Sequence, residues 1–164
     1  MTNVKEFGRV GVLMGGVSSE RTISLKSGRA IFEALKEEGY DVVAIDIAVS
    51  DPQLIATQLR TSGIQGAFIA LHGRLGEDGA IQKILEELGI PYTGSSAKAS
   101  ALAFDKAQTQ KILLEKGISV PPPLVFSNNK LLSYKDVCNT LKSSDVVVKP
   151  SCEGSSIGIH CSSC

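Results

Sequence analysis

The chain has 164 residues, of which 43% are apolar and 21% charged, and its formal net charge is zero. This length fits one domain, or one domain and part of another. The neutral balance excludes the basic footprint of a nucleic-acid-binding protein. No apolar run reaches 18 residues, so we predict no membrane span. The N-terminal MTNVKEFGRV lacks the apolar centre of a signal peptide, and we therefore expect a cytoplasmic protein.

Four cysteines stand late in the chain, at Cys138, Cys152, Cys161 and Cys164. A reducing cytoplasm disfavours disulfides. Cys161 and Cys164 form a single C-x-x-C, whereas a zinc ribbon needs two such pairs. We predict free thiols and no metal site.

Short apolar runs alternate with helical periodicity through the first 116 residues. The predicted strands cover 9–14, 41–47 and 66–71, with a short strand or turn at 91–94, and the predicted helices run from about 23 to Gly39, then over 52–60, 79–88, 96–104 and 106–116. The side chains expected to point inward are Ile23, Ser27, Ala30, Ile31, Ala34 and Leu35, then Leu54, Ile55 and Leu59, then Ile81, Ile84, Leu85 and Leu88. This order predicts an α/β fold with a parallel sheet and helices on both faces. Such sheets bind ligands beyond the carboxyl ends of their strands.

Three consecutive prolines, Pro121–Pro123, favour a stiff connector. After them we expect a strand at 124–126, a helix at 134–141 and strands at 146–149 and 157–160. These elements are too few to enclose a core, so we expect an incomplete second domain with exposed apolar strand edges after Val146. The predicted domains are 1–118 and 119–164.

The stretch GGVSSER, Gly15–Arg21, joins the end of a predicted strand to the start of a helix. Backbone N–H groups at such a point attract anions, and Glu20 stands among them as a candidate ligand-binding carboxylate. Alternatively, Glu20 only complements the helix dipole. The glycines do not form G-x-G-x-x-G, which weakens the alternative of a Rossmann-type oxidoreductase.

The stretch HGRLGEDG, His72–Gly79, follows the third predicted strand. His72 should lie at the rim of the sheet, where a ring can act as an acid, base or hydrogen-bond donor. It is alternatively a loop-packing residue. For Asp78 we favour a helix-capping role.

The stretch VVVKPSCEGSSIGIH, Val146–His160, places Lys149 at the end of a strand and before a loop of small residues. A lysine ammonium beside backbone N–H groups suits phosphate oxygens. The lysine precedes the loop, so this is not a Walker A motif. A plain hairpin with a solvated lysine is the alternative.

Together these stretches resemble the D-alanine–D-alanine ligases of the ATP-grasp superfamily. The resemblance is carried by VLMGGVSSER (12–21), ALHGRLGEDGAIQ (70–82), LGIPYTGS (88–95), ASALAFDK (99–106) and VVKPSCEGSSIG (147–158). It implies a Rossmann-like, pre-ATP-grasp sheet followed by an incomplete ATP-grasp α+β lobe. It also implies a reaction for cell-wall synthesis, in which ATP phosphorylates the carboxylate of one D-alanine and the amine of a second attacks this acyl phosphate.

The resemblance also implies roles for individual residues. Glu20 matches the glutamate that holds the ammonium of the first D-alanine, and His72 matches the histidine beside that substrate. Lys106 and Lys149 match the two lysines on the ATP phosphates. Ser155 matches the serine that links its loop to the substrate, while Gly154 and Ser156 supply loop backbone. ATP and Mg²⁺ (or Mn²⁺) are the implied cofactors, with the metal ligands expected in the family's C-terminal part, and a homodimer is the implied assembly.

Two positions depart from the family pattern, Thr22 after the Glu-Arg pair and Cys152 in the loop. The family's fold also continues for about as many residues again. We therefore expect this chain to be truncated and inactive alone. The alternatives are a ligase that joins D-alanine to D-lactate or D-serine, or a non-catalytic module for dimerisation or binding.

Overall fold

A computed structural model describes residues 8–126 and 132–162 of the chain. Contacts divide it into two compact units, of which the first ends at Ala101 and the second begins at Leu102. The domain limit between residues 118 and 119 stays a prediction.

The first unit is built on a parallel sheet, as predicted. Its strands are β1 (Val10–Gly15), β2 (Val42–Ile47) and β3 (Gly66–Ile69), in the order β2-β1-β3. The predicted short strand or turn near residue 92 adds a single parallel bridge, between Ala67 and Tyr92. Phe68 and Ala44 both pair with Val12, so β1 is the central strand.

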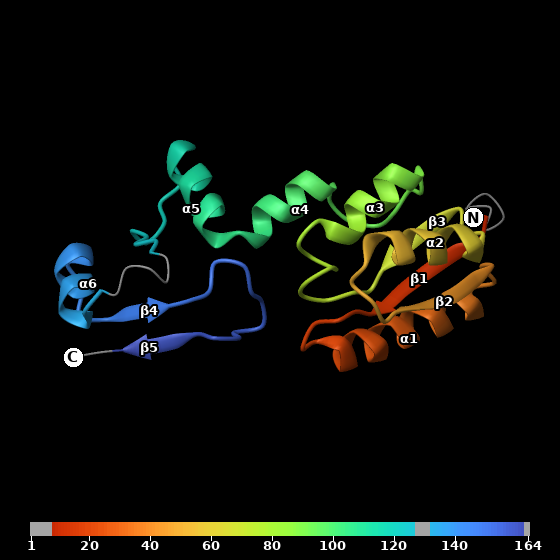
Figure 1. Cartoon of the computed structure of the whole chain (residues 1–164), viewed down its shortest axis with the longest axis horizontal. Helices are drawn as coiled ribbons and strands as arrows, with labels where there is room; N and C mark the ends of the chain where they lie inside the picture. Colours follow the sequence, from red (N-terminus) through yellow and green to blue (C-terminus); the bar gives the residue numbers. More distant parts are fainter. Residues whose placement is uncertain (1–7, 127–131, 163–164) are drawn as a thin grey trace. The chain divides into compact units, whose positions relative to one another are not determined.

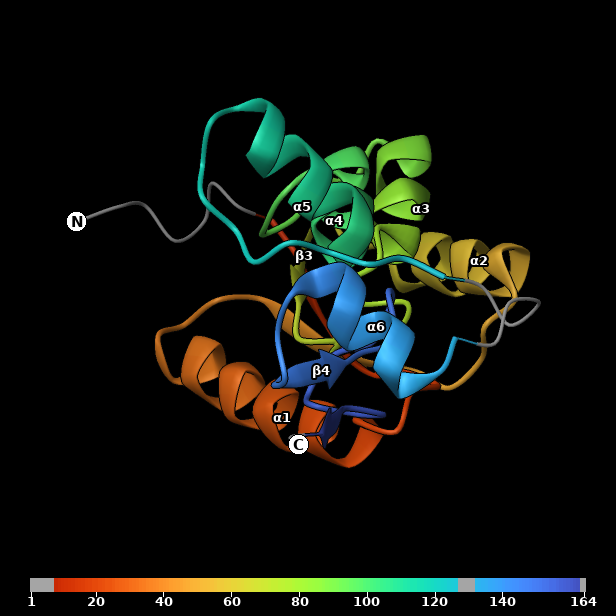
Figure 2. The ribbon, with the colours of Figure 1, turned by 90° about the vertical axis from the view of Figure 1, so that its left-hand side faces the viewer.

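Helices cover both faces of this sheet, as the alternation of side chains in β1 requires. Leu13 belongs to a core shared with α2 (Pro52–Ser62) and α3 (Ala80–Leu88). Val12 and Met14 point to the other face and pack against α1 (Arg21–Glu37). Figure 1 shows α1 on one side of β1 and the pair α2 and α3 on the other, and Figure 2 separates them in the same way. The predicted α/β architecture of this part of the chain is confirmed.

The buried face of α1 differs from the expected one. Ile23 is 60% exposed, and Ala30 and Ala34 are also exposed. The buried positions belong to Ser24 and Gly28 instead. A Cβ built on Gly28 would lie 2.4 Å from the Cβ of Met14, so only glycine permits this close approach of helix and strand.

The faces of α2 and α3 follow the sequence pattern more closely. Ile55 and Leu59 are fully buried, as predicted, whereas Leu54 is 58% exposed. In α3 the buried apolar residues are Ile81, Ile84 and Leu85, and Leu88 is half-buried. Leu54 lies one position before the fully buried Ile55, so it points to a different side of α2, away from the core.

The helix α4 (Ala97–Phe104) begins at a hydrogen-bonded carboxylate. Glu86 Oε1 accepts from the backbone N–H of Ala97 at 2.9 Å and from the hydroxyl of Tyr92 at 2.7 Å. Desolvation, together with this hydrogen bond, raises the pKa of Tyr92 to about 12. The two bonds lower the pKa of the Glu86 carboxyl, and they join α3 to the start of α4.

The second unit contains α5 (Lys106–Glu115), α6 (Tyr134–Leu141) and the antiparallel strands β4 (Val146–Val148) and β5 (His160–Ser162). Both helices and the hairpin were predicted. The second strand begins at His160 rather than at residue 157, and the strand expected at 124–126 does not form. A strand needs a hydrogen-bonded partner, and residues 124–126 have none among the described strands.

The exposed apolar edge expected after Val146 is present, since Val147 and Val148 are 53% and 43% exposed. None of the helices within the described residues has the length and apolar character that crossing a membrane requires.

Candidate functional site

The strand order brings two polar loops to one edge of the sheet. The chain passes from β1 to β2 on one side and then crosses to β3 on the other, so the order reverses at β1. Ligands of parallel sheets bind at such a reversal, beyond the carboxyl ends of the strands. The loops that leave those ends are GGVSSE after β1 and HGRLGEDG after β3. They touch, because Ser18 Oγ donates to the carbonyl of His72 at 3.0 Å.

Ser24 fixes the two strand ends relative to each other. Its fully buried hydroxyl accepts from Gly15 N at 2.9 Å and donates to the carbonyl of Ala70 at 2.7 Å. A single hydroxyl thus joins the last residue of β1 to the residue that follows β3. Both loops leave the sheet from a rigid base.

Glu20 stands at the N-cap position of α1, but its side chain makes no capping hydrogen bond. Its backbone N–H donates to Ser18 Oγ at 3.2 Å. A Cβ built on Gly73 would lie 2.5 Å from Glu20 Oε2, so the carboxylate reaches the residue next to His72. Glu20 and His72 therefore lie at the same edge of the sheet.

His72 lies between a hydroxyl and a carboxylate. Its Nε2 is 3.1 Å from Ser27 Oγ, and its Nδ1 is 3.8 Å from Glu77 Oε1. The side chain is 34% exposed, so part of the ring reaches solvent. We call Ser18, Glu20, Ser27, His72 and Glu77 the sheet-edge cluster.

The loop after His72 is held by its own side chains. Asp78 accepts from Leu75 N and from the first N–H of α3, Ala80 N, both at 3.1 Å, although the N-cap position itself belongs to Gly79. The buried Gln82 donates from Nε2 to the carbonyl of Gly76 at 2.7 Å. These bonds fix the backbone on both sides of Glu77.

Side-chain bonds also hold the turn that follows β1. Arg21 and Asp46 form a bidentate pair, with N–O distances of 2.8 and 2.7 Å, and Arg21 also donates to the carbonyl of Gly16 at 3.1 Å. The Asp46 carboxylate raises the pKa of the Arg21 guanidinium. A Cβ on Gly15 would lie 2.1 Å from Asp46 Oδ1, so glycine leaves room for the pair.

Sequence reasoning missed Ser18 and Ser24, and it counted Ser27 only as a core position. Their hydroxyls bond to backbone or ring atoms about 45 to 55 positions away in the chain. One feature of the sequence could have pointed to Ser24. It is a polar residue inside an otherwise amphipathic helix, and a glycine, Gly28, follows it four positions later.

In the second unit, the residues at the start of α5 bond to the β4–β5 loop. Lys106 donates from Nζ to the carbonyl of Glu153, and its backbone N–H donates to the carbonyl of Ser151 at 3.0 Å. Asp105 caps α5 and also accepts from Ser151 Oγ at 2.7 Å. The bond from Ser151 is the main reason that the pKa of Asp105 falls to about 2.

The other residues that were predicted to bind phosphate lie along the hairpin of β4 and β5. Lys149 is exposed just after β4. At the tip, Ile157 N donates to the carbonyl of Gly154 at 3.0 Å, around Ser155 and Ser156. These two serines have φ values of 49° and 61°, as the central residues of primed hairpin turns do. The structure thus joins Lys106 to the loop, and it leaves Lys149 and both serines solvent-exposed.

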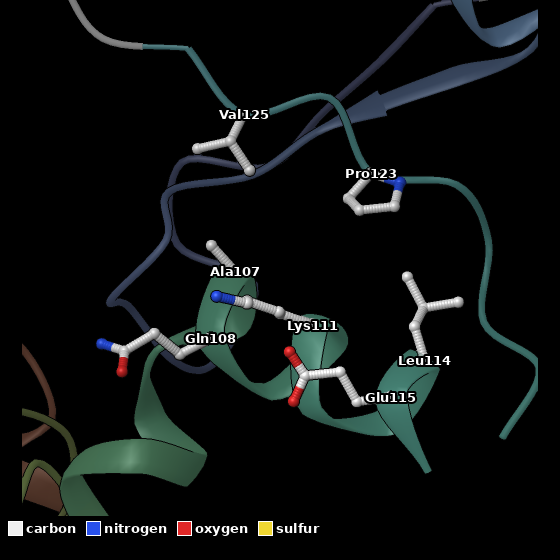
Figure 3. A pocket seen from close by; sticks show the side chains of 7 residues that line it. All are labelled: Ala107, Gln108, Lys111, Leu114, Glu115, Pro123 and Val125. Carbon is white, nitrogen blue, oxygen red and sulfur yellow. The ribbon is translucent and has the colours of Figure 1, made fainter. Parts of the chain in front are cut away.

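A separate open cavity of about 510 Å³ lies between α5 and the connector after it, as Figure 3 shows. It is lined by Ala107, Gln108, Lys111, Leu114, Glu115, Pro123 and Val125. None of these was predicted as a site residue. Within residues 8–126 and 132–162, no three His, Cys, Asp or Glu side chains gather as metal ligands.

Comparison with known proteins identifies relatives. The family model for the D-Ala–D-Ala ligase N-terminus matches residues 9–57 and 48–95. A D-alanine–D-alanine ligase of Desulforudis audaxviator is 51% identical over 152 residues, covering 93% of this chain and 48% of the relative. The chain spans about half the length of the curated relatives it matches.

Solved structures show the same likeness. The D-alanine–D-alanine ligase of Bacillus anthracis superposes with a TM-score of 0.81 at 36% identity, covering 95% of this chain and 49% of that one. The structure of that organism's ligase complexed with ATP gives a TM-score of 0.80 at 33% identity, with coverages of 95% and 50%.

The two matches to the family model together span residues 9–95, which is more than half of the 164 residues. That span contains the whole parallel sheet and every member of the sheet-edge cluster. The chain therefore belongs to the D-alanine–D-alanine ligase family, in the part that the family describes as its N-terminus.

Proposed function

We propose that this chain binds the first D-alanine for a ligase that joins two D-alanines with ATP, through an acyl phosphate, in peptidoglycan synthesis. The names of the relatives support D-alanine as the acceptor. The alternatives, D-lactate or D-serine as acceptor and a purely non-catalytic module, are not favoured. The proposal rests on one observation, the convergence of Glu20 and His72 at the edge where β1 and β3 end.

The sheet-edge cluster suits a small zwitterion. The Glu77 carboxylate lies 3.8 Å from the His72 ring and the Glu20 carboxylate reaches the neighbouring Gly73, and two such carboxylates attract an ammonium group. Since the bond from Ser18 Oγ to the carbonyl of His72 already holds the two loops together, little reorganisation is needed on binding. In this role Glu20 binds and orients the amino acid, and His72 lies beside it.

The hairpin of the second unit suits phosphate oxygens. Lys106 and Lys149 supply ammonium groups, and Gly154, Ser155 and Ser156 form a small-residue turn whose backbone can approach an anion closely. ATP bound to a similar structure supports this assignment. ATP would supply the phosphoryl group, while the described residues bind and orient it.

The described residues do not fit a resident Mg²⁺ or Mn²⁺. Mg²⁺ prefers several oxygen ligands in an octahedron, and within residues 8–126 and 132–162 no three His, Cys, Asp or Glu side chains come together for it.

A binding experiment tests the proposal directly. We expect D-alanine, but not L-alanine, to shift the amide resonances of Gly16, Ser18 and Gly73 in ¹H–¹⁵N spectra of the chain. Glu20→Gln should weaken the binding of D-alanine at least about tenfold, because the carboxylate charge of Glu20 is lost from a hydrogen bond to the ligand. Glu33→Gln, on an exposed position of the same helix, is the matched control. Equal binding of the two enantiomers, or no effect of Glu20→Gln, would reject the proposal.

The remaining assignments are part of the same proposal. Free thiols at Cys138, Cys152 and Cys161, and the use of ATP, fit a cytoplasmic protein. A homodimer stays a prediction, to be measured by sedimentation of the purified chain.

A further inference from the structure

Ser27 contacts the ring of His72 directly. It lies on α1, half-buried, one turn after Ser24 and two turns after Glu20. Its Oγ is 3.2 Å from the carbonyl oxygen of Ser24 and 3.1 Å from His72 Nε2. A serine hydroxyl carries a single hydrogen, so it can donate only one of these two bonds.

The geometry favours donation to the carbonyl. A carbonyl oxygen can only accept, so the 3.2 Å contact with the Ser24 carbonyl uses the Ser27 hydrogen and leaves an Oγ lone pair facing the ring. The ring nitrogen must then carry the hydrogen and donate it to Oγ. In the opposite arrangement Nε2 would accept and Nδ1 would carry the hydrogen, with Glu77 Oε1 as its acceptor at 3.8 Å, which is too long for a hydrogen bond.

We propose that Ser27 is a positioning residue that holds neutral His72 as its Nε2–H tautomer and so leaves the Nδ1 lone pair as an acceptor beside Glu77. Nδ1 and Glu77 Oε1 are then two acceptors 3.8 Å apart. Two acceptors at this separation are bridged by an N–H donor such as an amino group. That this donor is the ammonium of an amino acid rests on the proposed function, whereas the tautomer does not.

The tautomer can be read from the ring nitrogens. The chain has two histidines, His72 and His160, so His160→Gln leaves one ring to observe. Long-range ¹H–¹⁵N correlation of ¹⁵N-histidine-labelled protein, at a pH where the ring is neutral, distinguishes the two tautomers. We expect Nε2–H to dominate. A population of Nε2–H below one half overturns the inference.

Variants of Ser27 then show whether its hydroxyl determines the tautomer of His72. In Ser27→Ala the ring loses its acceptor, and we expect the Nδ1–H population to rise several-fold. Ser27→Thr keeps a hydroxyl that can bond to the same carbonyl, and it should restore the wild-type pattern. An unchanged tautomer in Ser27→Ala contradicts the inference. Should Ser27→Ala not fold, the tautomer populations measured in the wild type and in Ser27→Thr still test the inference.

The same samples separate this inference from the proposed function. D-alanine should bind about fivefold more weakly to Ser27→Ala than to the wild type or to Ser27→Thr. If D-alanine does not bind to any of them while the Nε2–H tautomer dominates, the positioning role stands and the proposed function fails. If D-alanine binds while Nδ1–H dominates, the proposed function stands and the role of Ser27 fails.

Discussion

Gly73 and Gly89 have nearly the same backbone conformation in different surroundings. Their φ values are 64° and 67°, but a Cβ on Gly73 would meet Glu20 Oε2 at 2.5 Å, whereas one on Gly89 would meet nothing within 4 Å. Alanine at either position should cost about 1 kcal/mol of unfolding free energy, because left-handed backbone disfavours a Cβ. Only Gly73→Ala must also displace the Glu20 carboxylate.

We therefore predict that Gly73→Ala and Gly89→Ala lower stability alike in urea unfolding followed by circular dichroism, while Gly73→Ala alone weakens D-alanine binding. Because both variants share the cost of a Cβ on left-handed backbone, a difference in D-alanine binding between them is not due to that cost. Equal D-alanine affinity in both variants would show that the position of the Glu20 carboxylate does not matter.

A second residue-scale prediction concerns Ser24. Alanine there would leave Gly15 N and the Ala70 carbonyl buried without their common partner. We expect a loss of about 2–4 kcal/mol in unfolding free energy, since each buried unpaired group costs about 1–3 kcal/mol. Ser62→Ala removes a hydroxyl that bonds only to the carbonyl of Leu59 in its own helix, and it should cost much less. Equal losses would mean that Ser24 does not join the strand ends.

These residues also show where prediction from sequence stops. Glu20 and His72 could be singled out because each follows an apolar strand, and parallel topology places such positions at one edge. Ser24 could not, because both of its partners come from β1 and from the segment after β3. A polar residue inside a helix is normally assigned to solvent, and only the three-dimensional contact shows the hydroxyl to be satisfied.

At the scale of elements, periodicity predicted the strands and helices better than it predicted their faces. The apolar stripe chosen for α1 included Ile23, which is exposed, and missed Gly28, which is buried. Close packing on Met14 selects the side with the smallest residue, and hydropathy does not contain this information. The segment 124–126 had strand-like composition, but strand formation also depends on a neighbouring strand.

Asp105 joins two elements, and its titration should report the connection. Hydrogen bonds from Ser151, Gln108 and Ala107 lower its pKa from 3.8 to about 2. A lowered pKa in the folded chain means that the stabilisation is complete above about pH 4 and is lost as the pH falls through 2. We predict that the amide resonances of Ala107 and Gln108 titrate with a midpoint near pH 2.

A variant isolates the bond between α5 and the hairpin. Ser151→Ala removes the largest cause of the lowered pKa but keeps both helix-capping bonds. The midpoint should therefore move up toward 3.8, while α5 remains helical. An unchanged midpoint in Ser151→Ala would show that the loop does not bond to Asp105 in solution.

At the scale of the whole molecule, the apolar core is very unevenly distributed. Among the described residues, Val146 is the one buried apolar residue after Ala101, whereas the first unit contains two buried clusters. Large apolar side chains in the second unit are exposed instead, among them Leu114, Ile118, Val125 and Phe126. Since burial of apolar surface is the main favourable term in folding, the second unit should be much the less stable.

Hydrogen exchange measures this difference within one sample. We predict that amides of β1, β3 and α3 exchange at least about 100-fold more slowly, relative to their intrinsic rates, than those of α5 and α6, which corresponds to about 3 kcal/mol. Short helices without a buried face open locally, because propensity alone does not stabilise them in water. The first unit should keep its protection when urea has already removed that of α6. Equal protection in both units would mean that something other than an apolar core stabilises the hairpin and its helices, such as association between copies of the chain. A dependence of the protection on protein concentration would then identify this association.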